Sequence, residues 1–342
     1  MPIAVVGAGQ WGTALAQAFA AAGRDVSLWA RDPALAASLA SSRVNERYLP
    51  DLVLHEAVRV SNDLAAVLDG AGVAIIAVPT GGLRAVAHAC LGHLDPKCAV
   101  VSAAKGFESD TSRRMSEVLT EVLGPDSERR VAVMSGPNIA PEIARGLPAA
   151  TVVASADPET AAQVRDELTG SQLRVYSNDD LTGVEYGGAL KNVVAIAAGI
   201  ADGVGAGDNG KAALITRGIT EMARLGVQAG ARAITFAGLT GLGDCVVTCM
   251  SPLSRNRRLG EAIGQGRSLR EAQASIHMVA EGVTTARVAA GLALRHGVEM
   301  PIVTEVCAVL FDDKPIAAAL GDLMRRGARD ELREFGLDFS RG

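Results

Sequence analysis

The sequence predicts an α/β fold in two parts, a doubly wound sheet at the N-terminus followed by an all-helical domain. Short apolar, β-branched runs alternate with helical patterns as far as about residue 180, which is typical of βα units that form a parallel sheet. From Leu181 onward the sequence shows long helical patterns and no convincing strand. We therefore expect domains at residues 1–180 and 181–342, with residues 178–180 capping the first helix of the second domain.

The composition is that of a globular protein. The 342 residues are 49% hydrophobic, which is enough for sizeable cores, and they carry a formal net charge of −5. This charge gives no reason to expect nucleic acid or an anionic membrane as a partner. The chain starts directly with a strand and has no run of about 18 apolar residues, so we expect a cytoplasmic protein without membrane insertion.

The cysteines are expected to be free thiols that behave as small buried hydrophobic residues. Their number, five, is odd, and the chain is too long to need disulfides. Two of them, Cys245 and Cys249, can share a helix face, but no nearby His or Cys completes a zinc site. We therefore expect no bound metal. The other cysteines are Cys90, Cys98 and Cys307.

The first turn of the chain has the pattern of a dinucleotide-binding site. Residues 3–6 form an apolar strand, and a helical pattern follows from Thr13. Between them Gly7, Gly9 and Gly12 have the G-x-G-x-x-G spacing. Gly7 would make the tight turn, Gly9 would let the backbone approach a pyrophosphate, and Gly12 would allow close helix–sheet packing. The pyrophosphate would bind N–H groups at the helix N-terminus, which predicts a Rossmann-like cofactor domain.

The residues after the second strand bear on the choice between NAD and NADP. Gly23 ends the first helix, and residues 25–29 are predicted as the second strand. A carboxylate after this strand suits the ribose 2′-hydroxyl of NAD, whereas an arginine suits the 2′-phosphate of NADP. Arg31 comes first and can bind a phosphate through two N–H groups, so we expect NADP(H). Asp32 keeps NAD(H) open, and a surface turn without a cofactor role is the remaining alternative.

Further apolar runs predict buried parallel strands, whose C-terminal ends form the ligand-binding edge of such a sheet. Lys105 follows one of these runs and would emerge at this edge, although a surface lysine is equally common there. Residues 135–140 follow another run and lead into a helix, and a further helix begins at Pro158. The predicted strands are residues 73–79, 99–103, 131–134, 150–154 and 173–176.

The second domain begins with a lysine in an apolar setting. Lys191 and Asn192 lie in the middle of a small-residue-rich helix predicted at residues 184–201. The Lys191 ammonium group must extend to solvent, find a partner or take part in chemistry, because burial can lower the pKa of a lysine toward the range useful for proton transfer. Glycine-rich joints between helices are predicted at residues 203–210, 226–230 and 238–243.

Two polar groups follow in the second domain. Asp244 comes directly after a flexible glycine-rich loop. Ser254, Arg255 and Asn256 lie within residues 251–258, where hydroxyl, amide and guanidinium groups cluster at a helix start. Such a cluster suits a small phosphate, because arginine binds phosphate through two N–H groups. A solvated run of charges is the usual alternative.

Several motifs in this order resemble those of bacterial NAD(P)-dependent glycerol-3-phosphate dehydrogenases, and the resemblance runs from residue 3 to about residue 325. It implies reversible reduction of dihydroxyacetone phosphate by NADPH or NADH to sn-glycerol 3-phosphate, for phospholipid synthesis. It also implies a helical domain similar to the C-terminal domain of 6-phosphogluconate dehydrogenase, and a homodimer. The motifs are residues 7–14, 135–138, 188–192, 207–217, 241–244 and 251–258.

The resemblance also implies roles for individual residues. Lys191 matches the family's catalytic lysine, which would protonate the C2 oxygen of the substrate as hydride arrives. Asp244 matches the carboxylate beside it, and Lys105 matches a residue near the nicotinamide and the substrate. The other substrate positions are Gly136, Asn138, Ser254, Arg255 and Asn256. The cofactor positions besides the glycines are Gln10, Trp11, Arg31, Asp32, Tyr48, Lys105, Ala140, Arg255, Val279 and Glu281.

Some residues depart from the family pattern. Gln10 replaces a common Ser or Ala, Asn138 a common Ser or Thr, and Tyr186 and Cys245 a common Leu. We expect these departures to affect fine contacts and not the reaction. The alternatives are a related dehydrogenase acting on another hydroxy acid or polyol phosphate, and an NADP(H)-binding sensor without catalysis. Residues after Glu331 are predicted as a frayed tail.

Overall fold

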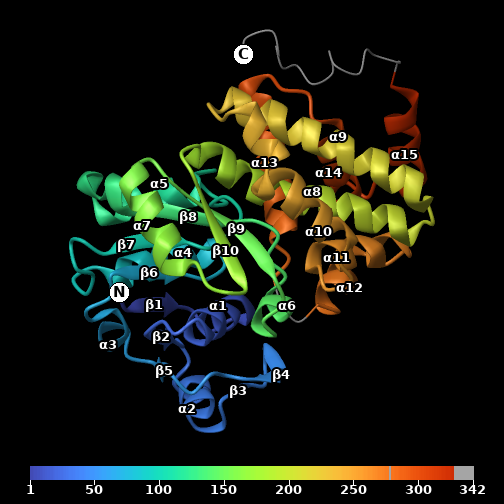
Figure 1. Ribbon diagram of the computed structural model, residues 1–342. Coiled ribbons are helices and arrows are strands. Elements are labelled where there is room, and N and C mark those ends of the chain that lie inside the picture. The colour runs from blue at the N-terminus through green and yellow to red at the C-terminus, as the bar shows by residue number, and fades with distance from the viewer. Residues whose placement is uncertain (277–278, 327–342) are drawn as a thin grey trace. The chain divides into compact units, whose positions relative to one another are not determined.

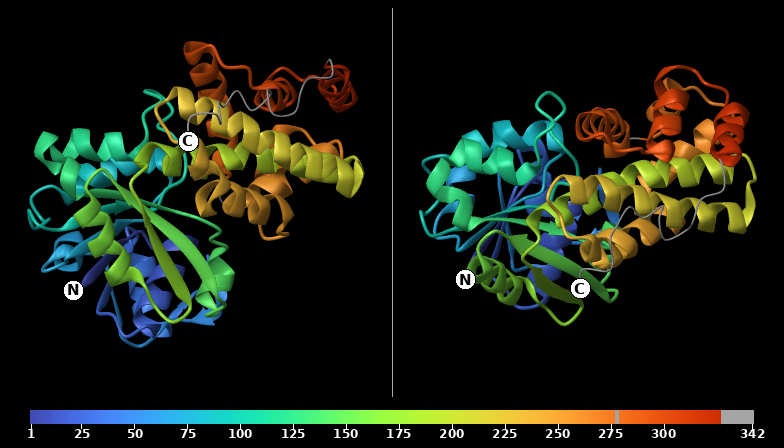
Figure 2. Two further views of the ribbon diagram at one scale, coloured as in Figure 1. Left: turned by 45° about the horizontal axis from the view of Figure 1, so that its top comes forward. Right: turned by 90° about the horizontal axis from the view of Figure 1, so that it is seen from above.

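The computed structural model describes residues 1–276 and 279–326 (Figure 1). The tail predicted after Glu331 lies outside this part of the chain. The described chain divides into two compact units, which Figure 2 shows from further sides. The first unit contains Met1–Glu108 and Arg113–Leu181, and the second contains Ser109–Ser112 and the described residues from Thr182 on.

The first unit contains an eight-stranded sheet in the order β10-β9-β8-β7-β6-β1-β2-β5. On either side of the β1–β6 pair the strand order runs in opposite directions, which makes this pair the topological switch point where such sheets bind ligands. The strands are β1 (Ile3–Val6), β2 (Val26–Trp29), β5 (Val58–Ser61), β6 (Val73–Ile76), β7 (Ala99–Ser102), β8 (Val131–Ser135), β9 (Ala149–Ser155) and β10 (Leu173–Asn178).

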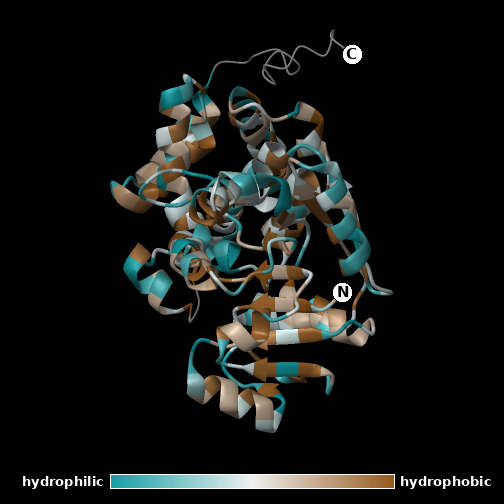
Figure 3. Cartoon of the chain, turned by 90° about the vertical axis from the view of Figure 1, so that its left-hand side faces the viewer, coloured by the Kyte–Doolittle hydropathy of each residue, from teal (hydrophilic) through white to brown (hydrophobic). Residues whose placement is uncertain are grey.

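Alternate residues of the strands enter two separate hydrophobic cores. In β1, Ile3 and Val5 pack into one core, whereas Ala4 and Val6 pack into the other. Helices cover both faces, and Figure 3 shows hydrophobic colour along most of the strands. The doubly wound prediction is therefore confirmed. The helices are α1 (Gln10–Ala21), α2 (Pro33–Ser42), α3 (Leu64–Leu68), α4 (Thr80–Cys90), α5 (Met115–Leu123), a 3₁₀ helix (Pro125–Arg130), α6 (Ala140–Ala144) and α7 (Pro158–Leu168).

The sheet differs from the prediction in direction, in length and in number of strands. β8 and β9 pair antiparallel, whereas their apolar runs predicted parallel strands. The strand predicted at residues 73–79 ends at Ile76, and α1 begins at Gln10 and not at Thr13. The structure also contains β5 and a small antiparallel hairpin of β3 (Val44–Asn45) and β4 (Leu49–Val53), which the sequence did not predict.

The second unit is all-helical over its described residues, as predicted. Its first helix, α8, is buried along most of its length, since it consists largely of small and apolar residues. In this unit the helices are α8 (Leu181–Gly203), α9 (Gly207–Gln228), a 3₁₀ helix (Ala233–Ala237), a π-helix (Leu239–Gly243), α10 (Asp244–Met250), α11 (Arg255–Gly264), α12 (Leu269–Ala274), α13 (Glu281–His296), α14 (Pro301–Phe311) and α15 (Ile316–Arg325).

Glycines let α8 and α11 cross with their backbones in contact. A Cβ atom on Gly199 would lie 1.9 Å from the carbonyl oxygen of Arg257. A Cβ atom on Gly260 would likewise lie 2.0 Å from the carbonyl oxygen of Ile196. Neither position can hold a larger side chain without separating the helices. This crossing brings the start of α11, with Asn256, against the middle of α8.

Part of the predicted glycine-rich joints is helical. Residues 207–210 form the first turn of α9, and Gly226 lies near its end. A Cβ atom on Gly226 would lie 2.2 Å from the ring of Phe236, so this glycine serves close packing and not chain flexibility. Among the described residues no helix is long and apolar enough to cross a bilayer.

A buried carboxyl group in the second unit makes the stability of the protein depend on pH. Glu221 of α9 is 3% exposed and accepts hydrogen bonds from the backbone N–H groups of Ile302 (2.8 Å) and Val303 (3.4 Å) at the start of α14. Burial raises the pKa of Glu221 to about 7, although these donors, Arg224 and Arg326 favour the charged form. The folded chain therefore binds more protons than the unfolded chain between pH 4.5 and about 7.

Because of this difference, we expect the Glu221 contribution to stability to be full below pH 4.5 and to be lost as the pH rises through 7. Glu221→Gln keeps an acceptor without the charge. The free energy of unfolding of the wild type, relative to this variant, should fall by up to about 3 kcal/mol from pH 4.5 to pH 8. Denaturant unfolding of both proteins at several pH values measures it. A difference between the two proteins that stays constant with pH would refute this assignment.

Candidate active site

The glycine turn between β1 and α1 has the geometry that a pyrophosphate site needs. Gly7 has a φ of +120°, and a Cβ atom there would lie 2.7 Å from the carbonyl oxygen of Ala77, just beyond β6. A Cβ atom on Gly12 would lie 1.8 Å from the carbonyl oxygen of Gly7. Beside Gly9, in contrast, no atom lies within 4 Å of a Cβ position. Gly7 and Gly12 therefore close the turn, and Gly9 leaves its outer side open.

The start of α1 has the features of an anion site. In the described chain no side chain caps this helix at Gly9, and the first N–H groups of a helix have no acceptor within it. Gln10 donates from Nε2 to the carbonyl oxygen of Tyr48 (3.2 Å), and Trp11 packs against a cluster that includes Ala140. The structure thus gathers the predicted cofactor residues Gln10, Trp11, Tyr48 and Ala140 around one helix start.

Arg31 and Asp32 follow β2 and are both exposed. Asp32 is the N-cap of α2, since its Oδ1 accepts a hydrogen bond from the backbone N–H of Ala34 (2.9 Å). One carboxylate oxygen of Asp32 is therefore already engaged in capping.

Lys105, Gly136 and Asn138 lie together at the ends of β7 and β8. Lys105 donates from Nζ to the carbonyl oxygen of Gly136 (2.7 Å). Asn138 donates from Nδ2 to Oγ1 of Thr151 (3.0 Å), and that hydroxyl donates to the carbonyl oxygen of Ser135 (2.9 Å). Thr151 is not among the residues predicted from the sequence; its only signal is a hydroxyl group within a largely apolar strand. It fixes the Asn138 side chain beside Gly136.

In the second unit, Lys191 has a partner and does not extend to solvent. Its Nζ lies 2.9 Å from Oδ1 of Asp244, and the two residues are 6% and 1% exposed. Nζ also donates to Oγ1 of Thr248 (2.7 Å), and this hydroxyl donates to the same Asp244 oxygen (3.2 Å). An ammonium group has three N–H bonds, so one remains for a substrate atom. Thr248, which lies one helical turn after Asp244, is not among the residues predicted from the sequence.

The polypeptide that carries Asp244 is held by close backbone contacts. A Cβ atom on Gly241 would lie 2.2 Å from the carbonyl oxygen of Phe236, so only glycine fits this tight π-helical turn. Thr240 donates from Oγ1 to the carbonyl oxygen of Val184 on α8 (2.9 Å). These contacts fix the start of α10 against α8 and therefore Asp244 against Lys191.

The predicted phosphate-binding residues lie at the start of α11. Ser254 caps this helix by accepting from the backbone N–H of Arg257 (3.2 Å). Asn256 donates to Oδ1 of Asn192 (2.9 Å), and its own Oδ1 accepts from the backbone N–H of Gly282 (3.0 Å). These bonds link the helix start to α8, beside Lys191, and to α13.

Arg255 is turned toward the segment before α13. One of its Nη1 hydrogens binds the carbonyl oxygen of Val279 (3.0 Å). Burial lowers the pKa of Arg255, whereas the charge of Glu281 raises it. Arginine side chains are not deprotonated in proteins, so Arg255 keeps its positive charge. Arg255, Val279 and Glu281, which the family resemblance implies as cofactor contacts, therefore lie together.

Other features of the described chain fall outside these groups. Cys245 and Cys249 have their sulfur atoms 3.9 Å apart, and their hydrogen bond together with burial raises the pKa of Cys245 far above its usual range. All the cysteines are unpaired thiols, as predicted, and no cluster of described residues is suited to hold a metal ion.

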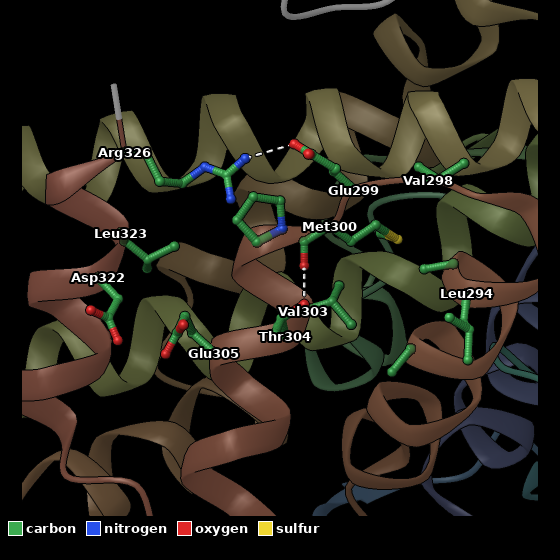
Figure 4. A pocket seen from close by; sticks show the side chains of 13 residues that line it. Leu294, Val298, Glu299, Met300, Val303, Thr304, Glu305, Asp322, Leu323 and Arg326 are labelled. Carbon is green, nitrogen blue, oxygen red and sulfur yellow. Dashed lines mark hydrogen bonds and ion pairs between the residues drawn. The ribbon is translucent and has the colours of Figure 1, made fainter. Parts of the chain in front are cut away.

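A cavity of about 500 Å³ between α13, α14 and α15 contains none of the candidate residues (Figure 4). Its rim carries an ion pair between Arg326 and Glu299 (2.8 Å). The apolar residues that line it include Leu294, Val298 and Met300.

The candidate residues form two groups, one in each unit. The glycine turn with Lys105 belongs to the first unit, and Lys191 with Asp244 and Arg255 belongs to the second. A doubly wound sheet with an open phosphate-binding turn, combined with a buried lysine–carboxylate pair, defines a dehydrogenase that uses a dinucleotide cofactor.

Comparisons with known proteins identify the family. The profiles of NAD-dependent glycerol-3-phosphate dehydrogenase match residues 2–161 for the N-terminus and 180–321 for the C-terminus. Glycerol-3-phosphate dehydrogenase (NAD(P)+) of Moorella thermoacetica is 48% identical over 330 residues, 96% of this chain and 97% of the relative. The crystal structure of glycerol-3-phosphate dehydrogenase from Coxiella burnetii is 40% identical with a TM-score of 0.89, covering 95% of this chain and 99% of that chain. The chain belongs to the NAD-dependent glycerol-3-phosphate dehydrogenase family and uses a nicotinamide cofactor.

Proposed function

We propose that the chain catalyses the reversible reduction of dihydroxyacetone phosphate by NADPH to sn-glycerol 3-phosphate, in the cytoplasm and in supply of phospholipid synthesis. The observation that carries this proposal is the Lys191–Asp244–Thr248 group, which leaves one ammonium proton for the substrate. The predicted phosphate-binding residues at the start of α11 are linked to the same part of α8. The test is to incubate the protein with NADPH and dihydroxyacetone phosphate and to identify the product. Formation of equimolar NADP+ and sn-glycerol 3-phosphate is expected, and absence of both overturns the proposal.

The first unit fits the cofactor. The uncapped start of α1 and the open side of Gly9 suit a pyrophosphate, and the residues around Trp11 enclose this helix start. The bound nicotinamide supplies the hydride. We assign residues 1–180 to cofactor binding and residues 181–342 to substrate binding and catalysis.

Lys191 acts as the acid in the direction of reduction. As hydride reaches C2, an Nζ–H bond of Lys191 breaks and an O–H bond forms on the C2 oxygen, which leaves a neutral amine. Asp244 and Thr248 accept the other two N–H bonds and so fix the direction of the third. In the reverse direction the neutral amine removes the hydroxyl proton.

Arg255 binds the phosphate of the substrate and approaches the cofactor. One N–H group is occupied by Val279, which orients the guanidinium and leaves the others for phosphate oxygens. Ser254 and Asn256 hold the helix start that carries Arg255, and the N-terminus of α11 favours an anion. We assign substrate contacts in the first unit to Lys105, Gly136 and Asn138.

Arg31 is proposed to select NADP(H). Asp32 is engaged in capping α2, whereas Arg31 is exposed and can reach a 2′-phosphate. Arg31→Ser should therefore raise the KM for NADPH by about 10- to 100-fold, which corresponds to the free energy of hydrogen bonds between charged groups. The KM for NADH should change less than about twofold. Initial rates with both cofactors measure this. Arg174→Ser, an exposed arginine on the edge strand β10, is the matched control, and an unchanged NADPH to NADH ratio in Arg31→Ser would reject the role of Arg31.

We also propose a homodimer, as the family resemblance implies and as is common for soluble enzymes. Light scattering after size-exclusion chromatography tests the oligomeric state. Elution with the mass of a monomer across a wide concentration range would reject the dimer.

A further inference from the structure

A buried asparagine contacts the phosphate-binding turn from the side of the small hairpin. Asn45, at the end of β3, is 1% exposed. Its Nδ2 donates to the carbonyl oxygen of Ala8 (3.0 Å), in the middle of the turn between Gly7 and Gly9. The same nitrogen donates to Oγ1 of Thr13 (2.8 Å) in the first turns of α1. One amide group therefore links the hairpin, the turn and the helix.

The hydrogen bond to Ala8 fixes the direction of a neighbouring N–H group. In a trans peptide the carbonyl oxygen and the N–H group point in opposite directions. The carbonyl of Ala8 and the N–H of Gly9 belong to one peptide unit, so holding the oxygen toward Asn45 points the Gly9 N–H away from it. A Cβ atom on Gly9 would meet no atom within 4 Å, so there is free space beside this residue.

The chemistry of Asn45 supports a role for its donor group. Oδ1 of Asn45 is buried and has no hydrogen-bond partner in the described chain. An unpaired buried acceptor lowers the stability of the fold, so the favourable contacts of the Asn45 side chain come from its donor group, Nδ2. A carboxylate could not donate to Ala8, and an apolar residue of similar size would leave the Ala8 oxygen buried without its bond.

A second hydrogen bond attaches the same hairpin to α1 at the other end of the hairpin loop. Gln10 donates from Nε2 to the carbonyl oxygen of Tyr48, three residues after Asn45. The hairpin is therefore attached to the start of α1 on both sides of the residues that join β3 to β4. Such attachment allows the hairpin to hold the turn in one conformation before the cofactor arrives.

We infer that Asn45 is a positioning residue that orients the Gly9 N–H toward the pyrophosphate of the cofactor. The inference rests on the proposed dinucleotide site and adds to it a residue outside the glycine motif. Asn45 acts on the pyrophosphate through the Ala8–Gly9 peptide and does not touch the reacting atoms. Its loss should therefore weaken binding of ligands that contain a pyrophosphate and spare those that lack one.

The test compares two probes of the cofactor site by calorimetry. One is 2′-phosphoadenosine 5′-diphosphoribose, which contains the pyrophosphate, and the other is adenosine 2′-monophosphate, which does not. Asn45→Leu should weaken binding of the first probe roughly tenfold and change binding of the second less than twofold. The KM for NADPH should rise to the same extent as the Kd of the first probe, with kcat at saturating NADPH within twofold of the wild type.

Controls separate this role from folding and from the proposed function. Thr13→Val removes one partner of Asn45 but keeps the bond to Ala8, so its affinity for both probes should match the wild type. Asn45→Asp, which has nearly the same shape, should show the same selective loss and serves if Asn45→Leu does not fold. Equal loss for both probes, or no loss, overturns the inference. Failure of the wild-type protein to bind the pyrophosphate probe overturns the proposed use of NADP(H), and absence of the product in the test of the proposed function overturns that function.

Discussion

Replacing Lys191 with alanine is expected to lower kcat for reduction of dihydroxyacetone phosphate by about 10³-fold, within the range that a positioned acid contributes. The physical reason is that Lys191 carries the only N–H that the group with Asp244 and Thr248 leaves for the substrate. The affinity for NADPH should stay within about twofold, because the glycine turn belongs to the other unit. Steady-state rates and fluorescence titration with NADPH measure the two quantities.

Two further measurements separate chemistry from stability in this variant. Removal of Lys191 leaves the Asp244 carboxylate buried without its cation, which destabilises the fold by itself. Lys191→Met, which fills more of the space, should show the same loss of kcat, and thermal unfolding of both variants reports the effect on stability. Added alkylamines, which can occupy the vacated position, should restore part of kcat in Lys191→Ala. Near-normal kcat in a folded variant would remove Lys191 from the role of acid.

Replacing Arg255 with alanine is expected to lower kcat/KM for dihydroxyacetone phosphate by about 10²- to 10³-fold, as the loss of a paired charged contact to phosphate predicts. Most of the change should be in KM, since Arg255 binds the end of the substrate that does not react. Arg255→Lys should recover little, because a lysine lacks the planar pair of N–H groups. Initial rates over a range of substrate concentrations measure kcat and KM separately.

Arg258 provides the matched control for this prediction. It lies one helical turn further along α11, is exposed and carries the same charge. Arg258→Ala should change kcat/KM less than about twofold, apart from a small effect of overall charge. A loss in Arg258→Ala as large as in Arg255→Ala would show that the charge of the region, and not a specific contact, determines binding.

The fold could be predicted from the sequence where local patterns determine it. The apolar runs and the glycine spacing of residues 7–12 predict a doubly wound sheet, since the inner strands β1, β2, β6, β7 and β8 are buried on both faces. The antiparallel direction of β9 could not be predicted, because a buried strand has the same composition in either direction. The hairpin of β3 and β4 was missed because its strands are short and partly exposed.

In the candidate site, too, some residues could be predicted from the sequence and their contacts could not. Lys191 and Asp244 could be singled out, since a charge in an apolar helix or after a glycine-rich loop is conspicuous in sequence. That they form an ion pair depends on how α8 and α10 pack, which no local pattern encodes. Thr248, Thr151 and Asn45 could not be predicted for the same reason. The role of each depends on its hydrogen-bond partners in the fold, and threonine and asparagine are common in any sequence.

The most direct test of the account is the rate of NADPH oxidation with dihydroxyacetone phosphate compared with dihydroxyacetone. The proposed reaction requires both a proton from Lys191 and a phosphate contact at Arg255, so kcat/KM should be higher with the phosphorylated ketone by at least about 10³-fold. Arg255→Ala should abolish most of this difference in kcat/KM between the two ketones. Equal rates with the two ketones, or oxidation of NADPH with a keto acid and not with dihydroxyacetone phosphate, would contradict the proposed function.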